Sequence, residues 1–128
     1  MRVAGIGCRK GVATSEVLAA IEAALAQAGL HDTQINALAT TRMKAEEPAI
    51  RSAGALLQLP VLMPCDEALQ EAGARCLTLS AASQRHSDLP SLSEAAALAA
   101  VGPNARLVGP RLAVGHVTCA IAVSEEMP

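Results

Sequence analysis

Short apolar runs alternate with amphipathic segments along the first half of the chain. Each run has the length of a buried strand, and each segment that follows has apolar residues at helical spacing. Strands are expected at residues 2–7, 35–40, 60–63 and 75–80, and helices at 15–28, from Pro48 onward and at 66–71. Gly29 fits the end of the first helix, Pro48 a first helical position and Asp66 a helix cap. The repeated strand–helix units predict an α/β fold with a mostly parallel sheet.

The second half departs from this alternation. Residues 81–90 are polar and rich in serine, which is typical of a loop. An alanine-rich helix follows, with Ser91 or Ser93 as its cap, and ends near Val101.

Two further β-rich runs, 105–113 and 115–123, meet around Val114 and Gly115. This pattern predicts a C-terminal β-hairpin that adds antiparallel pairing, so the sheet is expected to be mixed. Residues 124–128 have no periodicity and are expected to form a loose tail.

The composition favours one domain, residues 1–128. A chain of 128 residues that is 52% hydrophobic can bury one core but is too short for two ordinary domains. No apolar run reaches the roughly 18 residues of a membrane span, so we expect no membrane association and a cytoplasmic protein. A net charge of −2 and the lack of Phe, Tyr and Trp argue against nucleic acid as a partner. The alanine-heavy helices pack thinly, and a monomer or a homodimer joined through an alanine-lined face is expected.

The first strand runs into a glycine-rich loop, in which Arg9 and Lys10 precede Gly11. Glycines let the backbone approach a ligand, and the helix that follows offers unpaired N–H groups. The loop is therefore a candidate anion site for carboxylates or phosphates. The alternative is a plain strand-to-helix turn whose charges face solvent.

A second charged segment follows the second strand and contains Arg42, Lys44, Glu46 and Glu47. The carboxyl ends of parallel strands meet at one edge, so this segment and the glycine-rich loop are expected to share a crevice. Lys44 can hold a ligand carboxylate, and Glu47 can cap its helix or orient Lys44. A solvated run of charges is the alternative.

Several other chemistries lack their motifs. The glycine spacing does not fit the dinucleotide fingerprint, and no Walker A sequence is present, so no cofactor is expected. The four cysteines form no C-x-x-C pair and the histidines are scattered singly, so no metal site is expected. Cys8 lies beside two cations and could be a nucleophile, or it could fill space under the loop.

Four segments together resemble the CobE/CbiG C-terminal domain family of cobalamin (vitamin B12) biosynthesis. They are Gly5-Ile6-Gly7-Cys8-Arg9-Lys10-Gly11; Leu38-Ala39-Thr40 with Lys44 and Glu47-Pro48; Pro90-Ser91-Leu92-Ser93-Glu94-Ala95-Ala96-Ala97-Leu98; and Thr118-Cys119-Ala120-Ile121-Ala122. The resemblance spans nearly the whole chain and is greatest to the free-standing CobE members, which are linked to the aerobic route. Arg111 stands where the family usually has Lys, which keeps the charge but changes the donor geometry.

The resemblance implies a three-layer α/β/α sandwich that binds a corrin-ring precursor, of the precorrin or hydrogenobyrinic acid type, as a carrier or accessory protein. An enzyme, a hydrolase or isomerase acting on the same ring, is the alternative, with Lys44, Glu47 and Cys8 as catalytic candidates. A regulatory domain that binds another polycarboxylate or phosphate is a third. Another enzyme of the pathway is a candidate partner. The expected ligand-binding residues are Gly5, Gly7, Cys8, Arg9, Lys10, Gly11, Thr40, Lys44, Glu47, Ser93, Glu94, Arg111 and Thr118.

Overall fold

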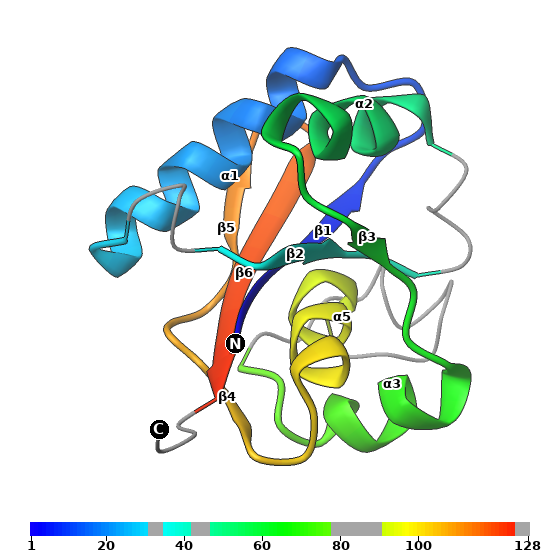
Figure 1. Cartoon of the computed structure of the whole chain (residues 1–128), viewed down its shortest axis with the longest axis vertical. Helices are drawn as coiled ribbons and strands as arrows, with labels where there is room; N and C mark the ends of the chain where they lie inside the picture. The colour runs from blue at the N-terminus through cyan, green and yellow to red at the C-terminus, as the bar shows by residue number, and fades with distance from the viewer. Residues whose placement is uncertain (31–34, 42–46, 78–90, 125–128) are drawn as a thin grey trace.

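The computed structural model describes residues 1–30, 35–41, 47–77 and 91–124, and these form one mixed sheet flanked by helices (Figure 1). The strands are β1 (Arg2–Cys8), β2 (Ala37–Ala39), β3 (Val61–Leu62), β4 (Ala105–Leu107), β5 (Leu112–Val114) and β6 (Val117–Ser124). The helices are α1 (Thr14–Ala28), α2 (Pro48–Leu57), α3 (Asp66–Gly73) and α5 (Leu92–Val101). None of these helices is long and apolar enough to cross a bilayer.

The sheet has the strand order β3-β2-β1-β6-β4, and β5 also pairs with β6. Strands β1, β2 and β3 are parallel, whereas β6 is antiparallel to β1, β4 and β5. The predicted C-terminal hairpin is confirmed, but its first arm is interrupted between β4 and β5, where the Val108 N–H still donates to the Ile121 carbonyl (2.9 Å). The mixed sheet is as expected, but the prediction that it is mostly parallel is wrong among the described strands, because two pairings are parallel and three, all made by β6, are antiparallel.

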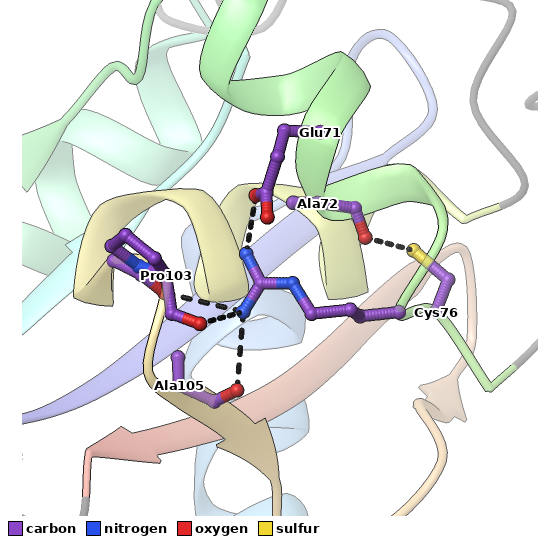
Figure 2. Close-up of polar contacts among 7 residues, drawn as sticks. Glu71, Ala72, Cys76, Pro103 and Ala105 are labelled. Atoms are coloured by element: carbon purple, nitrogen blue, oxygen red, sulfur yellow. Dashed lines mark hydrogen bonds and ion pairs between the residues drawn. The ribbon is translucent and has the colours of Figure 1, made fainter.

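The strand predicted at 75–80 does not form over its described part. Residues 75–77 follow α3 as a turn, and 78–80 lie outside the described residues. The physical reason is the set of contacts that the Arg75 side chain makes (Figure 2). Its guanidinium donates to the carbonyls of Gly102, Pro103 and Ala105 (3.1–3.3 Å) and pairs with Glu71 (2.6 Å). These bonds hold the chain after α3 against the loop that follows α5, rather than along a sheet edge.

Helices cover both faces of the sheet, which confirms the three-layer α/β/α sandwich (Figure 1). Side chains alternate along β1, so that Ala4 and Ile6 enter the core beneath α1 and α2, and Val3 enters the core beneath α3 and α5. The α1–α2 side carries the larger aliphatic side chains, while the α5 side is built largely from alanine. Apolar burial on both faces supplies most of the stabilisation, because no aromatic side chain is present.

Gly5 allows α5 to lie directly on β1. A Cβ atom at this position would lie 2.0 Å from the Ser93 carbonyl oxygen and 2.8 Å from the Ala97 Cβ. Gly5 and Gly7 both belong to β1, so the loop after this strand is shorter than the sequence suggests and begins at Arg9.

The helix ends agree with most of the predicted signals. Pro48 occupies the first turn of α2, and Gly29 follows α1 in the left-handed conformation (φ 73°). The predicted cap of α3 is wrong by one residue: Cys65 is the extended N-cap (φ −68°, ψ 161°) and Asp66 is the first helical residue. Asp66 still lies where its carboxylate interacts favourably with the helix dipole. Ser91, and not Ser93, occupies the N-cap of α5.

Candidate functional site

The loops after β1 and β2 meet at the carboxyl edge of the parallel strands. The Gly11 N–H donates to Oε1 of Glu47 (3.2 Å), which joins the glycine-rich loop to the start of α2. Glu47, the described end of the second charged segment, therefore lies beside the glycine-rich loop, as expected for consecutive parallel strands. Lys44, Arg42 and Glu46 lie outside the described residues, so their contribution to this edge stays a prediction.

Glu47 links these two loops through its carboxylate. The residue is the N-cap of α2, yet its side chain makes no capping hydrogen bond to that helix. Of the two predicted roles, side-chain capping of its own helix is not observed, and orientation of Lys44 falls outside the described chain. The contact with Gly11 instead gives Glu47 a role in fixing the shape of the edge.

Three backbone donors of the glycine-rich loop and of the helix start after it are engaged within the protein. Gly11 donates to Glu47, and the Ala13 N–H at the start of α1 donates to Oε1 of Glu16 (3.3 Å). The Arg9 N–H donates to the His116 carbonyl (3.1 Å). An anion at this loop would consequently be held by the side chains of Arg9 and Lys10, which are exposed and have no ion-pair partner within the described chain.

Gly7 and Thr118 face each other across β1 and β6. Oγ1 of Thr118 donates to the Gly7 carbonyl (3.3 Å). A Cβ at Gly7 would lie 2.8 Å from Oγ1 of Thr118 and 3.8 Å from the Ser93 Cβ. Three predicted site residues, distant in sequence, therefore meet beside the first turn of α5. Thr118 is half-buried, so this edge of the sheet is accessible to solvent beside it.

Glu94 is fully buried in the first turn of α5. Its Oε1 accepts from the Leu77 N–H and its Oε2 from the Arg111 N–H, both at 2.9 Å. Two backbone donors can stabilise a buried carboxylate, and here they also tie α5 to segments on either side of it. The structure thus brings Glu94 and Arg111 together and gives Glu94 a cross-linking role.

Thr40 and Cys8 make internal contacts. Oγ1 of Thr40 is buried and donates to the Ile6 carbonyl (2.9 Å), which fastens β2 to β1. Cys8 is half-buried and packs against the core beneath α1 and α2, an arrangement that suits the space-filling interpretation; a nucleophilic role stays a prediction. Burial raises the pKa of the Cys119 thiol to about 12, and burial together with the Glu94 charge raises the pKa of Cys76 to about 11, so both are protonated at neutral pH.

Three buried hydroxyls near this edge were not all expected from the sequence. Ser91 and Ser93 are fully buried and Thr41 is 4% exposed, and none of their hydroxyl oxygens has a hydrogen-bond partner within the described part of the chain. Ser93 is in the predicted site, whereas Ser91 and Thr41 are not. For Thr41 the sequence does hold a signal. Its position continues the alternation of Ala37 and Ala39, whose side chains face α5, and a polar side chain on that buried face needs a hydrogen-bond partner. No group of three metal-ligating side chains occurs among the residues that the structure describes.

Comparison with known proteins gives consistent results. Residues 2–122 match the family model described as cobalamin synthesis G C-terminus. The protein CobE from Sinorhizobium sp. is 30% identical over 120 residues, which are 94% of this chain and 78% of that protein.

Two solved structures share both the fold and the sequence pattern. The crystal structure of CobE, a protein from the cobalamin (vitamin B12) biosynthetic pathway, has a TM-score of 0.90 at 32% identity and covers 98% of this chain and 93% of that one. The cobalamin biosynthesis protein chiG from Agrobacterium tumefaciens str. C58 has a TM-score of 0.78 at 46% identity, covering 98% and 100%. A cobalamin biosynthesis protein G homolog from Sulfolobus solfataricus, with a TM-score of 0.68 at 22% identity, shares the fold over 97% of this chain and 37% of its own.

Proposed function

This chain belongs to the cobalamin synthesis G C-terminus family, a family of cobalamin biosynthesis proteins, and from that premise we propose that it binds a corrin-ring precursor. The ligand would be a precorrin or hydrogenobyrinic acid, and the role that of a carrier or accessory protein of the aerobic route. In the cytoplasm, such a carrier would protect an unstable intermediate and pass it to another enzyme of the pathway.

The contact between Gly11 and Glu47 is the observation that carries this proposal, because it joins two charged loops into one edge. A corrin precursor is a large apolar macrocycle fringed with carboxylates. Its recognition needs cations around a rim together with aliphatic surface. Arg9 and Lys10 supply exposed cations at the edge, and Lys44 is the further cation expected from the second loop.

A carrier is favoured over a hydrolase or isomerase by the contacts of the candidate catalytic groups. The Glu47 carboxylate accepts from a backbone N–H, and Cys8 packs against the core. The contact of Glu47 is explained by its structural role and requires no part in proton transfer. Turnover of the ligand is the result that would favour the enzyme instead.

Spectrophotometric titration with hydrogenobyrinic acid tests the proposal. Stoichiometric protein should perturb the visible spectrum of the ligand without converting an excess of it. Arg9→Ala and Lys44→Ala should each weaken binding by about 1 to 3 kcal/mol, and added salt should weaken the unmutated complex. Arg106→Ala is the matched control. Arg106 is an exposed cation on β4, and it lies opposite Val123 of β6, at the other end of the strands from the candidate site. Equal affinity of all three variants, with no effect of salt, would refute the cationic rim.

Complementation of a cobalamin-deficient strain separates the carrier from covalent catalysis. Cys8→Ser should leave pathway flux nearly intact. Glu47→Gln should lower flux or binding, because the charge-assisted bond that joins Gly11 to the second loop is weakened. Failure of Cys8→Ser alone, with folded protein and unchanged ligand binding, would overturn the carrier role in favour of a nucleophilic cysteine.

A further inference from the structure

The first turn of α5 is surrounded by polar atoms that lack partners. Oγ of Ser91, Oγ of Ser93 and Oγ1 of Thr41 are buried and make no hydrogen bond among the described residues. Buried hydroxyls are nearly always satisfied, because leaving one without a partner costs the full desolvation penalty of that group. Two of these hydroxyls, those of Ser91 and Ser93, belong to the start of α5, and they point to a polar ligand at this helix end.

Ser93 lies beside Gly7 on the α5 face of the sheet, and the alternation along β2 assigns Thr41 to the same face. Val3, Ala37 and Ala39 belong to the core beneath α5, and strict alternation extends this face to Gly7 on β1 and to Thr41 after β2. The Ser93 Cβ is 3.8 Å from the position that a Gly7 Cβ would occupy, which places the serine beside the end of β1.

The α5 N-terminus adds backbone donors to these hydroxyls. Its first intrahelical bond runs from the Ala95 N–H to the Ser91 carbonyl (2.9 Å), so the N–H groups of Leu92 and Ser93 have no carbonyl four residues earlier within the helix. The Ser91 side chain makes no capping bond. The Glu94 carboxylate accepts from the Leu77 and Arg111 N–H groups, which lie outside the helix.

We propose that the first turn of α5, together with Ser91, Ser93 and Thr41, is an anion subsite that takes one carboxylate of the ligand. The hydroxyls and the N–H groups of the turn donate to the carboxylate oxygens, and the positive end of the helix dipole stabilises the charge. Half-buried Leu92 and Thr118 mark where the carboxylate enters from the edge. The identity of this ligand, a corrin precursor, rests on the proposed function. Inorganic phosphate is a second source of the same anionic chemistry.

Single substitutions separate this site from a structural defect. Ser93→Ala removes a hydroxyl that has no internal partner, so the melting temperature of the ligand-free protein should stay the same or rise. The same variant should weaken hydrogenobyrinic acid binding about tenfold or more, the loss expected for a hydrogen bond to a charged group. Thr41→Val should act in the same way. Ser52→Ala, on an exposed face of α2, is the matched control and should change neither quantity.

Amide chemical shifts report the contact directly. With ¹⁵N-labelled full-length protein, hydrogenobyrinic acid and sodium phosphate are titrated separately, and the Leu92 and Ser93 amides are followed. Large shifts of both amides with hydrogenobyrinic acid, reduced in Ser93→Ala, support the subsite.

Two results would overturn the subsite. In the first, hydrogenobyrinic acid binds, but the Leu92 and Ser93 amides do not shift and Ser93→Ala binds with the same affinity as the unmutated protein. This result leaves the proposed function standing. The other is a lower melting temperature of ligand-free Ser93→Ala, which would show that the hydroxyl has an internal partner. If only phosphate moves the amides, the anion subsite is supported but the assignment of a corrin carboxylate to it is refuted. If hydrogenobyrinic acid does not bind the protein at all, the proposed function fails, whatever phosphate does.

Discussion

Replacing Gly5 by alanine tests the packing that forms the α5 side of the molecule. The new Cβ would lie 2.0 Å from the Ser93 carbonyl oxygen, and also 2.8 Å from the Cβ and the backbone N of Ala97. Two of these three atoms are helix backbone, which no rotamer change can move aside. The helix must therefore withdraw by about 1 Å or more to reach an ordinary contact distance. Overpacking costs about 1 to 3 kcal/mol, and a shift of a whole buried helix places Gly5→Ala at about 3 kcal/mol or above.

A loss of this size is readily measured. For a domain of this length it lowers the melting temperature by about 10 °C, against a total stability of about 5 to 15 kcal/mol. Thermal unfolding followed by circular dichroism is the assay. Gly109→Ala is the matched control, because a Cβ there meets no atom within 4 Å and the residue has no positive φ, so it should be neutral or slightly stabilising. A melting temperature of Gly5→Ala within about 2 °C of the control would refute the close approach of α5 to β1.

Two further substitutions probe the buried polar and ionisable groups. Glu94→Gln replaces one carboxylate oxygen by an amide donor, which then faces the N–H of Leu77 or Arg111. The substitution should therefore destabilise the fold by about 1 to 3 kcal/mol, measured by urea unfolding. An unchanged unfolding midpoint would contradict the cross-link. Burial raises the pKa of Cys119 from its ordinary 9.0 to about 12, so above pH 9 the unfolded state loses a proton that the folded state keeps, and stability falls as pH rises from 9 to 12. Cys119→Val should therefore lose less stability than the unmutated protein between about pH 8 and about pH 10, and parallel losses would show that this thiol does not contribute.

The local pattern of the chain is sufficient for most of the elements. Helical spacing, Pro48 and Gly29 locate α1 and the start of α2 to within a residue or so, because the signals that start and stop a helix lie within one turn of its ends. The strand predicted at 75–80 shows the limit of such signals. Its apolar content fits a strand, but the chain there is held by hydrogen bonds from Arg75 to carbonyls about thirty residues away.

The sequence by itself determined the α/β class, the C-terminal hairpin, the charged loops at the strand ends and the resemblance to the family. Each depends on neighbouring residues or on the order of short motifs. Only the tertiary structure decided that Gly5 and Gly7 serve the contact between β1 and α5, and that Thr118, 111 residues from Gly7, lies beside it. The same holds for the burial of the Ser91 and Ser93 hydroxyls. Periodicity states which face of an element is buried, but which groups meet there depends on strand register and helix approach, and these are set by packing between segments far apart in the chain.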